Sequence, residues 1–196
     1  MHRRLPMPCL LLIPLLLAGC RPPGNAPVRI APGAQLWLCP PQDAPDLFAT
    51  QEVRFLLPGG RRETVLVVLD NRDGNLSLVA STPMGQTLFV VRVRDLDPGV
   101  GAGVQAAVDV RVPLPAGLDP RTLAALVQFA LWPDAAVARS LGPGLSLRRD
   151  AAGRSLLRAG RVVWSVTWDG EAPPYRTLEL RNPAMDLDLK IRTVPE

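Results

Sequence analysis

Residues 62–94 read RETVLVVLDNRDGNLSLVASTPMGQTLFVVRVR, and this stretch decides the fold. Three runs rich in valine and leucine are separated by Asn71-Arg72-Asp73-Gly74 and by Thr82-Pro83-Met84-Gly85, which are both typical turn sequences. Runs of β-branched residues joined by short turns predict consecutive strands that pair in antiparallel fashion. The stretch therefore predicts a β-meander.

Further runs of the same kind continue the pattern on both sides of this stretch. The predicted strands lie at 51–57, 62–70, 75–81, 86–94, 106–112, 145–149, 155–159, 161–168, 175–181 and 186–193. In the last of them Leu187, Leu189 and Ile191 alternate with charged residues. Such alternation predicts a sheet with one buried face and one solvated face.

Between the two groups of strands the sequence predicts a pair of helices. Asp119 is a good N-cap, Pro120 suits the first helical position, and apolar residues then recur at helical spacing as far as Leu131. A second, short helix is predicted from Asp134 to Leu141. We therefore expect a mainly β, α+β fold in which one strongly curved antiparallel sheet wraps the helical pair.

The first 19 residues have the features of a signal peptide, with a cationic start and an apolar run shorter than the ~20 residues that span a bilayer. Leu17-Ala18-Gly19-Cys20 resembles the bacterial lipobox, in which the cysteine is lipidated and becomes the new N-terminus. An ordinary signal peptide with an unmodified cysteine is the alternative. Arg21 stands where inner-membrane lipoproteins carry aspartate. We therefore expect a lipid anchor at Cys20 that holds the protein on the periplasmic face of the outer membrane.

Residues 20–46 contain seven prolines, which favour extended, semi-rigid chain. We expect this segment to be a lipidated tether, apart from Gln35–Leu38, which is apolar enough to pack on the domain. Residues 47–196 then form the folded domain.

The composition argues against several classes of function. The formal net charge is +4 and no basic run exceeds two residues, so nucleic acid is not an expected partner. His2 is the only histidine and would be removed with the signal peptide, which takes away the commonest general base and zinc ligand. We expect no enzyme activity, no cofactor and no metal. Cys39 would be the one remaining free thiol, and we expect it to act as a small buried apolar residue.

Two polar motifs have simpler explanations than a site. Residues 70–75 look like the start of a calcium loop, but no glutamate stands at the twelfth position, so we expect a hairpin turn. Asp186 and Asp188 alternate on one strand face with Lys190 and Arg192, and we expect a solvated charge ladder rather than paired catalytic carboxylates.

Several segments resemble known envelope proteins. Residues 78–88 resemble the strand–turn–strand of the LolB outer-membrane lipoprotein receptors, whose turn carries a protruding hydrophobic residue. Residues 114–118, 128–133 and 188–193 resemble an uncharacterised family of bacterial lipoproteins, over about residues 51–193 in all. That resemblance implies a LolA/LolB-like half-barrel, encoded near fatty-acid and aryl-polyene synthesis genes. The resemblance to LolB implies that Met84 inserts into the membrane; a turn residue folded back onto the sheet is the alternative.

The function we expect is binding of an acyl chain, a lipid or a lipoprotein in an apolar cavity between sheet and helices, and its presentation or insertion at the membrane. Burial of each methylene contributes about 0.8 kcal/mol to such binding. The residues expected to line the cavity, each of which would equally serve as plain core, are Phe55, Val67, Leu69, Leu78, Phe89, Val91, Leu126, Phe129, Trp132 and Trp164. The expected partners are the outer membrane, through Cys20, and an acyl lipid or lipoprotein, bound by a monomer. The alternative is a non-catalytic assembly or structural lipoprotein of the envelope that acts through protein–protein contacts.

Overall fold

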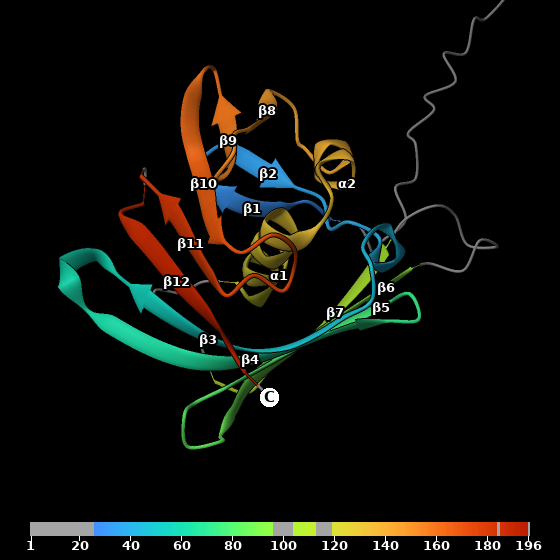
Figure 1. The fold of residues 1–196 in the computed structure, drawn as a ribbon, viewed down its shortest axis with the longest axis vertical. Helices are drawn as coiled ribbons and strands as arrows, with labels where there is room; N and C mark the ends of the chain where they lie inside the picture. The colour runs from blue at the N-terminus through green and yellow to red at the C-terminus, as the bar shows by residue number, and fades with distance from the viewer. Residues whose placement is uncertain (1–25, 96–103, 113–118, 184, 196) are drawn as a thin grey trace, which may run out of the picture.

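Two runs of hairpins build one antiparallel sheet of ten strands in the computed structural model of the protein, which describes residues 26–95, 104–112, 119–183 and 185–195 (Figure 1). The first run comprises β3 (Leu47–Leu56), β4 (Arg62–Arg72), β5 (Asn75–Ser81), β6 (Thr87–Asp95) and β7 (Val104–Val110). The second comprises β8 (Leu145–Arg149), β9 (Gly153–Arg158), β10 (Arg161–Asp169), β11 (Thr177–Asn182) and β12 (Leu187–Val194). β12 pairs with β3, which joins the two meanders in the order β7-β6-β5-β4-β3-β12-β11-β10-β9-β8.

The stretch that predicted the meander forms β4, β5 and β6 as expected. Asp73 and Gly74, which connect β4 to β5, both have positive φ values, of 52° and 70°. Two consecutive positive φ values are what a tight hairpin turn with right-handed strand twist requires. The residues that looked like a calcium loop are therefore a hairpin turn, as predicted.

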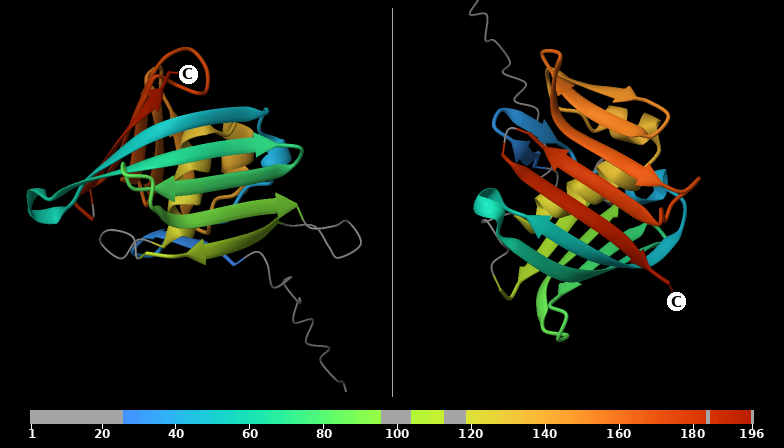
Figure 2. Two further views of the ribbon diagram at one scale, coloured as in Figure 1. Left: turned by 90° about the horizontal axis from the view of Figure 1, so that it is seen from below. Right: turned by 60° about the vertical axis from the view of Figure 1, so that its left-hand side comes forward.

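The sheet is open rather than closed. β7 and β8 are its edge strands, and no pairing among the described residues joins them. Figures 1 and 2 show the two meanders inclined to each other, with the helices on the side of the sheet that faces the angle between them. A mainly β fold with an antiparallel sheet and inserted helices is thus confirmed. The sheet is not strongly curled, and the predicted strong curvature is not confirmed.

The two predicted helices are present between the meanders. α1 (Pro120–Leu131) begins at Asp119, whose side chain accepts a hydrogen bond from the Arg121 backbone N–H at 2.9 Å. The shorter α2 spans Asp134–Arg139. α1 packs against β6 and β7, and every residue in it except Arg121 is buried. A helix that faced only the sheet would leave one side in water, so a further element must cover α1.

That element is a hairpin that the sequence did not predict. β1 (Val28–Ala31) pairs with β2 (Ala34–Leu36), and a 3₁₀ turn (Pro41–Asp43) follows. β1 packs against α1, and the hairpin's buried side chains belong to the main hydrophobic core. The tether predicted over residues 20–46 is therefore wrong from Val28 onward, although Gln35–Leu38 packs on the domain as expected. The prolines of this segment flank its strands and start the 3₁₀ turn, where the missing N–H is tolerated.

Hydrogen bonds from two buried tryptophans attach this N-terminal segment to the domain. The Trp164 indole Nε1 on β10 donates to the Ile30 carbonyl at 2.7 Å, and Trp132 Nε1 donates to the Pro40 carbonyl at 3.1 Å. Since a buried indole N–H needs an acceptor, the N-terminal segment satisfies polar atoms that the sheet and α1 leave unpaired.

Candidate functional site

All ten residues predicted to line an apolar cavity lie in one cluster of buried side chains. They come from β3, β4, β5, β6, α1 and its C-cap, and β10, and each is almost inaccessible to solvent. The members are Phe55, Val67, Leu69, Leu78, Phe89, Val91, Leu126, Phe129, Trp132 and Trp164. In this conformation the ten side chains together serve as hydrophobic core between the sheet and α1.

Along edge strand β7, side chains on the core face of the sheet become exposed to solvent. Val108 lies opposite Val91 and Val110 opposite Phe89, so both valines point to the core face of the sheet. Along that face of β7 the exposed fraction rises from 1% at Val104 to 36% at Val108 and 49% at Val110. The core face of the sheet therefore reaches solvent at the C-terminal end of β7.

The turn between β5 and β6 carries the most exposed large apolar side chain among the described residues, Met84, which is 97% exposed. The Gly85 N–H donates to the Thr82 carbonyl at 2.9 Å, and the Thr82 N–H donates to the Gln86 carbonyl at 2.8 Å. Gly85 has φ +85°, a value suited to glycine after a tight turn. Met84 is thus held outward by a hydrogen-bonded loop, and the alternative in which it folds back onto the sheet is wrong.

Met84, Val108 and Val110 lie at the same end of the sheet, and we call them the apolar end. β6 begins three residues after Met84, and its Phe89 pairs with Val110. Figure 2 shows the β5–β6 turn and the end of β7 on one side of the molecule. Val108 and Val110 offer an apolar surface next to the buried Phe89 and Val91, and Met84 projects from the neighbouring turn.

The opposite face of β7 is charged at this end. Asp109 pairs with Arg111, with 3.4 Å between Arg111 Nε and Asp109 Oδ2, and both side chains are exposed. Asp109 lies opposite Val90, so this ion pair is on the outer face of the sheet. The apolar end itself holds no titratable group, which suits binding of apolar groups rather than acid–base chemistry.

The charged residues of β12 form the predicted solvated ladder. Lys190 Nζ lies 2.9 Å from Glu179, Arg192 Nη2 lies 3.1 Å from Glu52, and all four side chains are on the outer face. Arg192 lowers the pKa of Glu52, and Lys190 lowers the pKa of Glu179, because each cation stabilises the carboxylate beside it. Asp186 is the exception, because it lies in the turn before β12 with φ 48°.

Cys39 is buried, as predicted, against α2. Its Sγ donates to the Ala136 carbonyl at 3.6 Å, and burial raises the pKa of the thiol to about 11. The thiol is therefore protonated at neutral pH and is a poor nucleophile. Within the described ranges no group of three His, Cys, Asp or Glu side chains is placed to hold a metal ion.

The sequence predicted a functional role for Met84 but not for Val108 and Val110. A signal was present, because Val108 and Val110 alternate with Asp109 and Arg111, which marks one apolar face on the last strand before α1. Cys20, the predicted lipidation site, lies outside the described residues.

Comparison with known protein families identifies the chain's relatives. A family model described as "Protein of unknown function (DUF3261)" matches residues 49–195, which span both meanders and the two helices. No curated protein matches the chain. Among the described residues, neither helix is long and apolar enough to cross a membrane.

Proposed function

The chain belongs to the DUF3261 family of proteins of unknown function, and from that premise we propose that it is a lipid-anchored outer-membrane protein with a LolA/LolB-like half-barrel. In this proposal it binds an acyl chain, a lipid or a lipoprotein between the sheet and α1. It then presents or inserts that ligand at the membrane through the apolar end. No covalent chemistry is involved, and the protein acts as a monomer whose lipidated Cys20 keeps it at the bilayer.

The observation that carries the proposal is the exposure of the core face at the apolar end. Val108 and Val110 are on the same face as the buried Phe89 and Val91, so an acyl chain bound along β7 would pass from solvent to core without crossing a polar group. Each methylene that leaves water contributes about 0.8 kcal/mol. An acyl chain laid over the two valines would therefore gain a few kcal/mol, and its entry beyond them would require α1 to move away from β6 and β7.

Met84 indicates which side of the protein would face the membrane. Its side chain is fully exposed at the tip of a turn that hydrogen bonds hold in one conformation. Burying a methionine side chain contributes roughly 1.5 to 3 kcal/mol. Contact of Met84 with a bilayer would therefore place the mouth between β7 and α1 against the lipid surface, where a bound chain can leave for the membrane.

Native mass spectrometry of the full chain, purified from membranes in detergent, tests the proposal. We expect the wild-type protein to carry acyl lipid and the double variant Val108→Glu/Val110→Glu to lose it, since two carboxylates at the mouth oppose an apolar chain. Leu56→Glu is the matched control, because Leu56 is a comparably exposed apolar residue on the outer face of β3. Wild-type protein without lipid, or a double variant as loaded as the control, would contradict the proposal.

The second candidate, an assembly lipoprotein that acts through protein contacts, is favoured by the edge of β7. Residues 107–110 are all exposed, and an exposed edge strand offers unpaired backbone groups to another chain. The Arg111 N–H donates to the Leu88 carbonyl on β6 at 2.8 Å, so the N–H of Val110 points to the free side. Lipid-free wild-type protein in the same experiment would favour this candidate.

A further inference from the structure

The outer face of β5, β6 and β7 carries a hollow of about 450 Å³ at the end of the strands away from Met84. Two rows of paired residues line it. One row crosses the three strands as Ser77, Arg92 and Ala107, and the next as Asn75, Arg94 and Gln105. All six side chains lie on the face opposite the core, because the core-facing positions between them are Leu76 and Val93.

Arg92 and Arg94 differ from the neighbouring arginines in that no described carboxylate serves as their counterion. On the same face Arg72 lies 2.8 Å from Asp70, and Arg111 lies 3.4 Å from Asp109. No carboxylate of a described residue lies within 4.0 Å of the guanidinium of Arg92 or Arg94. Among the described residues, therefore, no anion neutralises the two positive charges of this hollow.

A second hollow on this face provides a contrast. It lies across β11, β12, β3 and β4 and has a volume of about 490 Å³. There three of the four lining cations have anionic partners: Lys190 pairs with Glu179, Arg54 with Glu52, and Arg181 with Asp188, whereas Arg62 has no such partner among the described residues. An anion entering that hollow would meet the carboxylates of Glu63, Glu179 and Asp188, whereas no carboxylate of a described residue lines the hollow of Arg92 and Arg94.

Hydrogen bonds already orient the side chain of Arg94 in this hollow. Arg94 donates through Nε at 3.2 Å and through Nη2 at 2.9 Å to Oε1 of Gln105. This contact fixes the plane of the guanidinium and leaves its Nη1 donors, together with the Gln105 amide N–H groups, directed elsewhere. Ser77 lies opposite Arg92 and adds a hydroxyl donor. An oriented guanidinium loses less side-chain entropy on binding than a free one.

The spacing of these donors suits a tetrahedral oxyanion. Residues two apart on one strand are roughly 7 Å apart on the same face, so Arg92 and Arg94 stand on either side of a group a few ångströms wide. A phosphate between them would accept charge-assisted hydrogen bonds of about 2.7–2.9 Å from both guanidinium groups. Its remaining oxygens would meet the Ser77 hydroxyl and the Gln105 amide. A carboxylate could accept as many hydrogen bonds, but its two oxygens lie in one plane and present fewer directions to these donors than the oxygens of a phosphate.

We propose that this hollow binds a phosphate group, either as free phosphate or as the phosphate of a lipid headgroup. The site is separate from the apolar end, and it stands whether or not the protein carries an acyl chain. Phosphate bound here neutralises the charge of Arg92 and Arg94 and links the rows of β5, β6 and β7 across the outer face. The attraction is electrostatic, so binding weakens as salt concentration rises.

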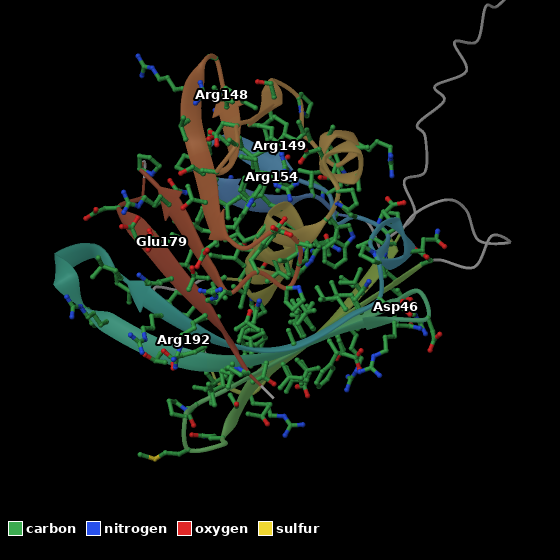
Figure 3. All side chains as sticks on the ribbon, in the orientation of Figure 1. Asp46, Arg148, Arg149, Arg154, Glu179 and Arg192 are labelled. Carbon is green, nitrogen blue, oxygen red and sulfur yellow. The ribbon has the colours of Figure 1, made fainter. Side chains whose placement is uncertain are left out.

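The test is calorimetric titration of the full chain, in uncharged detergent, with three probes: inorganic phosphate, short-chain phosphatidylglycerol and glycerol. We expect at least one phosphate probe to bind and glycerol not to bind. Arg92→Gln and Arg94→Gln should each weaken phosphate binding about tenfold or more, since a charge-assisted hydrogen bond is lost in each. Arg148→Gln, which changes an exposed arginine on edge strand β8, is the matched control and should leave binding unchanged (Figure 3).

The probes also identify the source of the phosphate. Phosphatidylglycerol that binds tenfold tighter than inorganic phosphate assigns the site to a lipid headgroup, and the reverse order assigns it to free phosphate. Arg92 makes no hydrogen bond to a described residue, so Arg92→Gln should fold like the wild type, and its circular dichroism spectrum checks this. Failure of both phosphate probes to bind at millimolar concentration, or equal binding by Arg92→Gln, Arg94→Gln and Arg148→Gln, would overturn the proposal.

Discussion

The side-chain amide of Gln128 pairs with the backbone of Cys39 through two hydrogen bonds, much as one strand pairs with another. The Cys39 N–H donates to Gln128 Oε1 at 2.8 Å, and Gln128 Nε2 donates to the Cys39 carbonyl at 2.9 Å. Both residues are buried. One side chain of α1 thus satisfies both backbone polar groups of a residue in the N-terminal segment, which cannot reach water.

Gln128→Met keeps the volume of this side chain but removes both hydrogen bonds. Each buried backbone group left without a partner costs about 1–3 kcal/mol, so we expect the free energy of unfolding to fall by roughly 2–5 kcal/mol. Urea unfolding followed by tryptophan fluorescence measures the change. Gln35→Met on β2 is the control, because Gln35 is exposed, and it should change stability by less than about 0.5 kcal/mol. Similar losses in both variants would show that the amide of Gln128 is not needed.

Arg154 holds the end of α1 against the start of α2. The side chain is 2% exposed. It donates to the carbonyls of Ala130 at 3.0 Å and Trp132 at 2.8 Å, and to Asp134 Oδ1 at 2.9 Å. Burial lowers the pKa of this guanidinium, and Asp134 acts in the opposite direction. Figure 3 shows Arg154 beside Arg149.

Arg154→Met would leave the two carbonyls without their donor and would leave Asp134 with Arg149 as its partner. We expect a loss of about 2–6 kcal/mol in the free energy of unfolding, measured in urea, since each of the two buried carbonyls left without its donor costs about 1–3 kcal/mol. Arg149→Met is the matched control. Arg149 lies over the Trp168 ring and 3.3 Å from Asp134, but it is about half exposed and should contribute about 1 kcal/mol or less. Equal losses of stability in the two variants would mean that the burial of Arg154 does not increase its contribution to stability.

The elements that the sequence predicted well are those with local causes. The β4–β5 turn follows from Asp73 and Gly74 themselves, and the start of α1 follows from Asp119 and Pro120. Each of these depends on neighbours in the chain, so a short window contains the information.

The parts that were missed depend on contacts between distant residues. β1 and β2 lie among prolines that, read alone, favour an extended tether, and they are folded by α1 and Trp164, more than 90 residues away. Val108 and Val110 are part of the site only because they stay exposed on the core face of the sheet, which no local pattern encodes. The sequence predicted the burial of the ten cavity-lining candidates because buried residues are mostly hydrophobic. Whether these residues can open into a cavity depends on the elements that pack over them.

The thiol of Cys39 should react far more slowly in the folded protein than after unfolding. Burial raises its pKa from 9.0 to about 11, which lowers the thiolate fraction near pH 8 by about a hundredfold. Iodoacetamide labelling, with the modified residue located by mass spectrometry, should show slow modification in buffer and rapid modification in urea.

The same pKa shift has a consequence for stability. The folded state favours the protonated thiol, so this contribution to stability is complete below pH 9 and is lost as pH rises from 9 towards about 11. Cys39→Ala removes the thiol, and its stability should vary less with pH across that window than that of the wild type. Parallel curves for the two proteins would contradict the assignment.

We expect glycine to be needed at position 85 because of its backbone conformation, and not because a side chain there would clash with its neighbours. Its φ is +85°, and a Cβ placed on it would meet no other atom within 4 Å. Gly85→Ala therefore costs only the strain of a left-handed conformation, about 1–2 kcal/mol, while Gly85→Asn should cost less because asparagine tolerates it better. Thermal unfolding of the two variants measures the difference. A loss with asparagine as large as that with alanine would point to a steric cause instead.

Met84 should enter the acyl region of a bilayer if the proposed function is correct. Met84→Trp places a reporter at a fully exposed position, so the fold should be unchanged. In vesicles that contain lipids brominated along their acyl chains, we expect the additional fluorescence of Met84→Trp, relative to wild type, to be quenched, because a residue at the apolar end contacts those chains. Arg148→Trp, on exposed edge strand β8, adds the same fluorophore away from that end and should not be quenched. Quenching of both variants would mean that the protein lies on the membrane without a preferred face, and quenching of neither would remove Met84 from the mechanism.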